Sequence, residues 1–150
     1  MNSTHSGVAR AAGTSSGHRT ARLPFGRDAV PLARARIVSD LVARGIPGQV
    51  VEEAESIVAE LVSNSVRHAS PLTDGMVRLH WRARDGVVEV EVTDGGGPTR
   101  PKPVPPSRLG VSGRGLRIVR SLAHEWGVVD SPQGCTVWAS VGGPSRRRAY

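Results

Sequence analysis

Three polar side chains recur at intervals of four residues in the string AELVSNSVRHA. They are Glu60, Asn64 and His68, and on a helix this spacing places them on successive turns of one side. An asparagine carbonyl is a hard oxygen ligand that suits a Mg²⁺ ion keeping most of its waters. Glu60 could accept a proton from a nucleophile near such a metal. Ordinary solvated helix faces have the same spacing, so the string alone leaves both interpretations open.

A second group follows a run of alternating apolar residues, where Asp94 precedes Gly95, Gly96 and Gly97. A carboxylate at the end of a strand can accept a hydrogen bond from the exocyclic amine of a flat ligand. Glycines, which lack a Cβ, would let that ligand approach the backbone closely. A plain strand-to-loop Asp-Gly turn is the alternative.

Two more glycine groups lie further along the chain. The segment Gly110 to Gly115 leads into a helical pattern, and backbone N–H groups at a helix start favour phosphates. It is neither a dinucleotide-binding fingerprint, because it follows a long loop rather than a strand, nor a Walker A loop, because no Gly-Lys-Ser/Thr follows. Gly134-Cys135-Thr136 enters a late strand, where Thr136 could offer a hydroxyl to a base or merely favour the strand.

Helical periodicity predicts the elements that position the first group. One helix is expected over residues 28–44, with Asp28 as its N-cap. A second is expected over residues 48–69, with one broad apolar face, and Ser70-Pro71 should end it. A shorter third helix is predicted over residues 116–123.

Alternating apolar and polar residues predict strands. The expected strands cover residues 76–83, 87–93, 126–129 and 135–141. Arg84-Asp85-Gly86 reads as a hairpin turn. The Pro- and Gly-rich segment from Gly95 to Ser112 reads as a long loop, of a kind that is usually either functional or disordered. Together the elements predict an α+β fold in which a layer of helices packs on a largely antiparallel sheet.

Composition limits the classes of protein that the chain can belong to. The formal net charge is +7, but six of the 20 basic residues lie before residue 23 or after residue 145, while all 13 acidic residues lie between those positions. The central part therefore lacks the basic surface of a nucleic-acid-binding protein. One cysteine and no apolar run long enough to span a membrane favour a cytoplasmic protein. We expect a disordered tail over residues 1–22, one domain over 23–145 and a basic tail over 146–150.

In chain order, the four groups resemble the sequence boxes of GHKL (Bergerat-fold) ATPase domains. The similar segments are Glu60 to His68 for the N box, Asp94 to Gly96 for G1, Ser112 to Gly115 for G2, and Gly134 to Thr136 for a late Gly-x-Thr element. The resemblance covers residues 28–141 and is greatest to the stand-alone anti-sigma-factor serine/threonine kinases. It implies a two-layer α/β sandwich with helices on one face of a largely antiparallel mixed sheet.

The resemblance also implies ATP and Mg²⁺ as cofactors and a role for each matching residue. Glu60 is implied as the catalytic base, Asn64 as the Mg²⁺ ligand, Asp94 as the acceptor for the adenine amine, and Thr136 as support for the base. The other residues implied at the nucleotide are His68, Gly96, Arg108, Gly113, Arg114, Gly115 and Leu116.

Two positions depart from the family pattern. Pro98 replaces the last glycine of G1, which stiffens the start of the loop. Val111 stands where some kinase members have an arginine that meets the γ-phosphate, and the sequence leaves open whether Arg108 or Arg114 takes that role.

The function implied by the resemblance is an ATP-dependent serine/threonine kinase that regulates transcription. It would phosphorylate an anti-anti-sigma partner of the STAS type and sequester a sigma factor, with no direct contact to nucleic acid or membrane; a homodimer is left open. One alternative is a non-catalytic, nucleotide-gated binding module, which Val111 favours. The other is a detached histidine-kinase catalytic domain, disfavoured because no His-bearing dimerisation helices precede residue 28.

Overall fold

The computed structural model describes residues 17–97, 118, 119 and 121–143. Two long helices and five strands lie within these ranges. In chain order they are β1 (His18–Pro24), α1 (Ala29–Ala43), α2 (Gly48–His68), β2 (Met76–Arg84), β3 (Val87–Asp94), β4 (Glu125–Ser131) and β5 (Gly134–Gly142).

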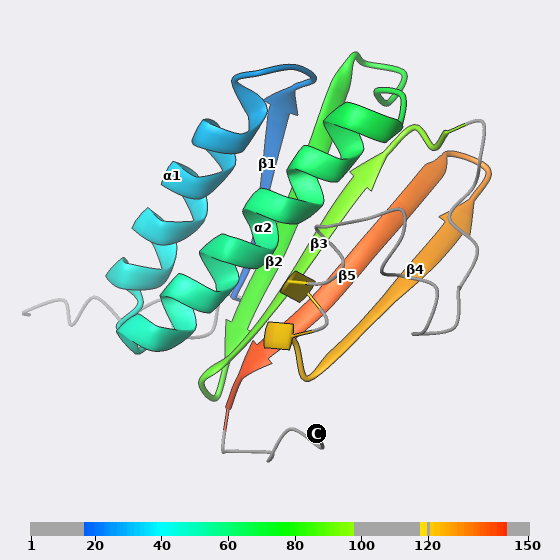
Figure 1. Ribbon diagram of the computed structural model, residues 1–150. Coiled ribbons are helices and arrows are strands. Elements are labelled where there is room, and N and C mark those ends of the chain that lie inside the picture. Colours follow the sequence, from blue (N-terminus) through cyan, green and yellow to red (C-terminus); the bar gives the residue numbers. More distant parts are fainter. Residues whose placement is uncertain (1–16, 98–117, 120, 144–150) are drawn as a thin grey trace, which may run out of the picture.

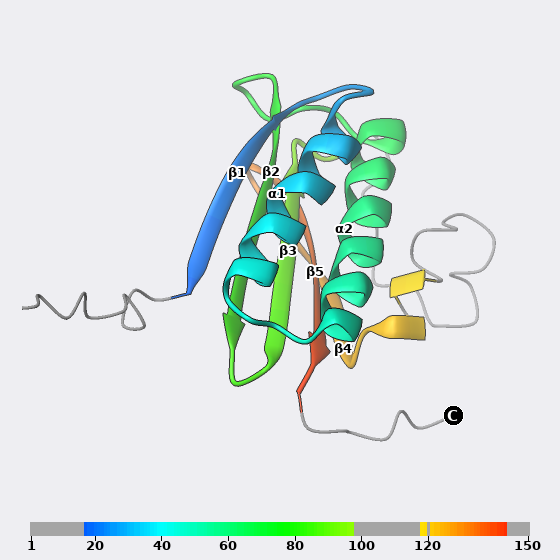
Figure 2. The same cartoon turned by 90° about the vertical axis from the view of Figure 1, so that its left-hand side faces the viewer.

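The strands form one sheet in the order β1-β2-β3-β5-β4, so β1 and β4 are its two edges. Both long helices pack on the same face of this sheet, as the two views in Figures 1 and 2 show. The α+β class and the two-layer arrangement are therefore confirmed. All four strand pairs are antiparallel, so the parallel pairing implied by a mixed sheet does not occur among the described strands.

The hairpin of β2 and β3 shows why the alternating pattern predicted strands. Val88, Val90 and Val92 point toward the helices and are buried, whereas Glu89 and Glu91 lie on the opposite face. The two-residue turn between the strands has Asp85 at φ 53° and Gly86 at φ 76°, the conformation that suits a tight hairpin. The predicted strands and turn are confirmed, each strand being one residue longer than expected.

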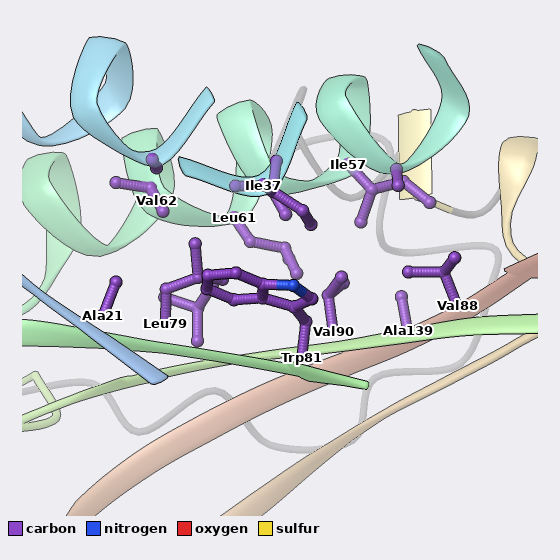
Figure 3. Close-up of a cluster of buried hydrophobic side chains, with 14 of the residues drawn as sticks. Ala21, Ile37, Ile57, Leu61, Val62, Leu79, Trp81, Val88, Val90 and Ala139 are labelled. Carbon is purple, nitrogen blue, oxygen red and sulfur yellow. The ribbon is translucent and has the colours of Figure 1, made fainter. Parts of the chain in front are cut away.

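The core lies between the helices and the sheet (Figure 3). The apolar face of α2 packs there as predicted, and Ile57, Leu61 and Val62 meet side chains of β2 and β3. Trp81 of β2 lies flat beneath the helices, and its indole N–H donates a 2.8 Å hydrogen bond to Asp40 of α1. Asp40 also pairs with Arg44 at 2.9 Å. The ring of Trp81 is thereby tied to the end of α1.

The start of the domain was predicted wrongly. Residues 18–22 belong to β1, not to a disordered tail. Gly17 directly precedes the strand, and residues 1–16 of the predicted tail lie outside the described residues. In β1, Ala21 and Leu23 are buried in the core, and Arg19, which alternates with them along the strand, pairs with Asp40 of α1 at 3.4 Å. As an edge strand it needs hydrogen bonds on one side alone, which β2 supplies along all seven residues. Pairing of this kind is a tertiary contact that local composition does not reveal.

The helix ends agree with the predictions to within a residue or two. Asp28 directly precedes α1, at the N-cap position where it was predicted, but it has helical dihedral angles and its side chain makes no capping hydrogen bond. The helix α2 ends at His68, where the N–H of Ala69 still donates to Ser65. The proline at position 71 follows shortly afterwards, as predicted.

Part of the predicted third helix and most of the long loop lie outside the described residues. Residues 118, 119, 121 and 122 are helical, and they lie on the helix-bearing side of the sheet (Figure 2). Val119 is buried in the core, and its carbonyl accepts a 2.7 Å hydrogen bond from Ala123. No helix in the described ranges is long and apolar enough to cross a membrane.

Candidate functional site

The candidate site forms where the last turns of α2 meet the end of β3 and the start of β5 (Figure 1). Its central side chain is Asp94, the last residue of β3, which is 6% exposed. Alternation along β3 places Asp94 on the helix-bearing face, together with Val90 and Val92. The antiparallel ladder places Cys135 of β5 directly opposite it.

Both oxygens of the Asp94 carboxylate are hydrogen-bonded. Oδ1 accepts the backbone N–H of Gly96 at 2.8 Å, and Oδ2 accepts the hydroxyl of Ser65 in α2 at 2.5 Å. The first bond is what an ordinary Asp-Gly turn would make. The second joins residues 29 positions apart in the chain and fixes the carboxylate against the helix. A simple turn does not account for that bond.

Burial changes the titration of Asp94. Removal from water raises the pKa of its carboxyl above the ordinary value of 3.8, while the hydrogen bonds from Ser65 and Gly96 oppose that rise. Each carboxylate oxygen can accept two hydrogen bonds. After the two bonds above, each oxygen therefore keeps capacity to accept another from a ligand.

The glycines after Asp94 allow their backbone to lie close to the loop that follows α2. The N–H of Gly95 donates to the carbonyl of Ser70 at 2.7 Å, and the N–H of Ser70 donates to the carbonyl of Gly96 at 2.8 Å. A Cβ at Gly95 would collide with the carbonyl of Pro71. Gly96 has φ +82°, a conformation that favours glycine. The loop after α2 and the glycine segment are thus held together beside Asp94.

The predicted N-box residues share one flank of α2. Glu60 and Asn64 are half-buried and His68 is exposed. Ala59, which is buried, and Val66, which packs against the core, lie on the other flank. Because Asn64 immediately precedes Ser65, whose hydroxyl contacts Asp94, the fold brings the predicted metal ligand and the predicted adenine acceptor to one region.

Thr136 is not brought to that region. Its partner across the ladder is Thr93, and the two hydroxyl oxygens are 2.7 Å apart. Thr93 precedes Asp94 by one residue, so both threonines point to the face of the sheet opposite the helices. The support for the base that the resemblance implied for Thr136 is therefore not seen; the side chain facing Asp94 is Cys135.

Cys135 is 3% exposed, and burial, followed by the charges of Asp94 and Asp130, raises the pKa of its thiol to about 11. The thiol is therefore protonated at neutral pH. Gly134 just before it allows close strand contact, because a Cβ there would run into the backbone carbonyl of Asp94.

Ser65 and Cys135 were both missed from sequence. A signal existed for Ser65, a polar residue on the apolar face one turn after Leu61 and Val62. Cys135 follows only once the register of β5 against β3 is known, since a shift of one residue exchanges it with Thr136.

The remaining predicted nucleotide residues lie outside the described residues. They are Arg108, Gly113, Arg114, Gly115 and Leu116. Two described residues fit the implied cofactors, one for ATP and one for Mg²⁺. Asp94 keeps free acceptor capacity for an amine, and Asn64 carries a half-buried carbonyl of the kind Mg²⁺ takes. Within the same ranges no three His, Cys, Asp or Glu side chains are grouped to hold a metal.

Comparison with known proteins gives one family. Residues 23–141 match the model of the histidine kinase-like ATPase domain. No curated protein sequence matches the chain. Among solved structures, the chain resembles the crystal structure of the RsbU and RsbW domains of Rv1364c from Mycobacterium tuberculosis, with a TM-score of 0.64 and 20% identity. The match covers 86% of this chain and 34% of the other, so the chain spans about a third of that protein's length.

Proposed function

Because the chain belongs to the histidine kinase-like ATPase domain family, we propose that it binds ATP with Mg²⁺ between α2, the end of β3 and the start of β5. The observation that carries the proposal is the buried Asp94 carboxylate, held by Ser65 and Gly96. A carboxylate fixed in this way has only acceptors to offer, which suits the exocyclic amine of adenine.

Asn64 is the proposed Mg²⁺ ligand and Glu60 the proposed base. Bound ATP would supply the phosphoryl group for transfer. Asn64 would hold the metal through its carbonyl oxygen, and Glu60, one turn earlier on the same flank, would accept the proton of an attacking hydroxyl. Support comes from their shared, half-buried position beside the residue that contacts Asp94.

The substrate of the transfer is proposed to be a serine of a STAS-type anti-anti-sigma protein. In the alternate state the chain would sequester a sigma factor and so regulate transcription. The support is the sequence resemblance to anti-sigma-factor serine/threonine kinases and a fold shared with the structure of the RsbU and RsbW domains of Rv1364c. We propose a cytoplasmic protein that makes no direct contact with nucleic acid.

A nucleotide-gated module without transfer activity is the second candidate. Val111, in the place where some kinase members carry an arginine, is the observation that favours it. Both candidates bind ATP, and they differ in whether a phosphate reaches the partner.

Incubation with labelled ATP and the STAS and sigma proteins encoded beside the gene would test the proposal. Wild type is expected to transfer an acid-stable phosphate, as on serine, and Glu60→Gln to bind ATP but transfer none. Ser63→Ala, which changes another half-buried polar residue of α2, is a control expected to keep transfer. Equal transfer by wild type and Glu60→Gln would remove Glu60 from the mechanism. An acid-labile phosphate would instead indicate histidine-kinase chemistry, and ATP binding without any transfer the gated module.

A further inference from the structure

We propose that Ser65 is a positioning residue that keeps Asp94 a pure hydrogen-bond acceptor and thereby determines the preference for adenine over guanine. The inference rests on the proposed ATP site and assigns a role to a residue that the sequence motifs do not include. Ser65 itself is not proposed to touch the nucleotide.

The geometry of Ser65 is the first argument. It lies on the sheet-facing side of α2, is 5% exposed, and its hydroxyl approaches Oδ2 of Asp94 at 2.5 Å. A serine within a helix can instead donate to a backbone carbonyl of the preceding turn. Here the only proton of the hydroxyl is directed at Asp94, which makes the contact a charge-assisted bond of short length.

The second argument is that the two bonds act on different oxygens. Gly96 holds Oδ1 from the chain segment of Asp94 itself, and Ser65 holds Oδ2 from the helix. Two anchors on two oxygens fix the plane of the carboxylate. With Gly96 alone, the group could turn about one contact and present its oxygens in other directions.

The third argument concerns the charged and titratable groups around Asp94. The group that faces it from β5 is Cys135, a thiol that remains protonated at neutral pH, and Asp130 of β4 lies beyond Cys135 in the ladder. In the described ranges Asp94 has no ion pair with a basic side chain. The hydroxyl of Ser65 and the amide of Gly96 are therefore the groups that stabilise its charge against burial.

Removal of the hydroxyl should change what Asp94 can recognise. Without Ser65, burial favours the protonated carboxyl more strongly, and a protonated carboxyl carries a donor. A donor can pair with the O6 acceptor of guanine, which the ionised group repels. The preference for ATP over GTP should then depend on pH, and it should weaken as the pH falls.

Ser65→Ala removes the hydroxyl with little change in volume. Thr93→Val is the matched control, because Thr93 is also buried and hydrogen-bonded but points to the opposite face of the sheet. Two measurements are made on wild type and both variants: the titration of the Asp94 carboxyl carbon by NMR without nucleotide, and the ratio of ATP to GTP affinity between pH 5.5 and 8.

The expected result is a higher pKa of Asp94 in Ser65→Ala, roughly tenfold weaker ATP binding at neutral pH, and a selectivity ratio that falls toward one at low pH. Thr93→Val should match wild type in all three, and Ser65→Thr, which restores a hydroxyl, should recover the wild-type titration.

An Asp94 titration in Ser65→Ala that coincides with those of wild type and Thr93→Val would overturn the role of Ser65, whether or not ATP binds. If the Asp94 titration is shifted in Ser65→Ala but the ratio of ATP to GTP affinity equals that of wild type at every pH, the role of Ser65 in base selectivity is overturned. The proposed ATP site would be unaffected by that result. Wild type that binds neither nucleotide would instead remove the proposed function, and the selectivity role with it.

Discussion

Cys135 of β5 and Asp94 of β3 are direct partners in the antiparallel ladder, and both side chains point to the face that carries the helices. The pairing puts a neutral thiol beside a buried carboxylate. The thiol and the carboxylate thus come from two strands, and the two residues are 41 positions apart in the chain.

This pairing predicts a loss of stability at alkaline pH. The pKa of the Cys135 thiol rises from 9.0 to about 11 in the folded protein. A raised folded-state pKa adds stability that is complete below pH 9 and is lost as the pH rises from about 9 to 11. Two pKa units correspond to roughly 2–3 kcal/mol. In urea unfolding between pH 8 and 11, wild type should lose about that much more stability than Cys135→Ala. If stability fell equally with pH in the two proteins, the raised pKa of the Cys135 thiol would be contradicted.

A second prediction concerns Asp40, which accepts the indole N–H of Trp81 and pairs with Arg44. Asp40→Ala leaves the indole N–H of Trp81 without its acceptor and Arg44 without its ion-pair partner, while Arg44 still donates to the carbonyl of Gly17 at 2.7 Å. The substitution should lower the free energy of unfolding by about 2–3 kcal/mol. Glu89→Ala is the control, since Glu89 pairs with the exposed Arg82 on the outer face of the sheet and should change stability by less than about 1 kcal/mol. Similar losses in both variants would contradict the claim that the contacts of Asp40 stabilise the fold more than an exposed ion pair does.

A third prediction concerns Gly95. A Cβ at this position collides with the carbonyl of Pro71, so Gly95→Ala must push the glycine segment away from the loop after α2. We expect a loss of about 1–3 kcal/mol in stability and weaker ATP binding, because Asp94 directly precedes the displaced segment. In Gly48→Ala, at the open start of α2, stability should be equal or slightly higher. Calorimetric melting of the three proteins tests this, and wild-type behaviour of Gly95→Ala would be incompatible with the packing.

The fourth prediction concerns the metal. Asn64→Ala should keep a cooperative fold but lose the part of ATP-induced stabilisation that depends on Mg²⁺. Thermal melts with ATP, with and without Mg²⁺, measure this difference. Arg67→Ala, which changes an exposed residue of the same helix turn, should retain it. Full Mg²⁺-dependent stabilisation in Asn64→Ala would exclude this residue as the ligand.

How far sequence alone could predict this molecule depended on whether the signal was local. The helix α2 and the hairpin of β2 and β3 carry an apolar period and turn residues within the segment itself, so their bounds were predicted to within one residue. The strand β1 buries only two apolar side chains, Ala21 and Leu23, which is too few for a clear apolar period. Most of it was therefore predicted as part of the tail, because what makes it a strand is its pairing with β2.

In the candidate site, too, the residues with a local sequence signal could be predicted and the contacts that depend on tertiary structure could not. Asp94 and Asn64 could be singled out because each occupies a recognisable position in its own element. The contact of Ser65 with Asp94 depends on how α2 docks on the sheet, and the choice between Cys135 and Thr136 depends on a strand register set across the sheet. No local pattern contains either relation.

Asp94 itself is the residue on which the nucleotide site depends, and its replacement offers a built-in control for folding. Burial raises the pKa of Asp94 in the folded state above its ordinary value of 3.8. The protonated carboxyl therefore stabilises the fold fully below pH 3.8, and this stabilisation is lost as the pH rises through the pKa of the folded protein. At neutral pH the ionised group therefore lowers stability. Asp94→Asn keeps the shape, can still accept from Gly96, and should be at least as stable as wild type without nucleotide.

The most direct test is calorimetric titration of wild type and Asp94→Asn with ATP and with GTP at fixed Mg²⁺. An ionised Asp94 accepts from the amine of adenine and repels the O6 of guanine, so wild type should prefer ATP by roughly tenfold or more. The asparagine variant can turn either end of its amide toward the base, and it should bind ATP more weakly and discriminate less against GTP. Equal affinity of wild type for ATP and GTP would contradict the account, because Asp94 would then not read the base.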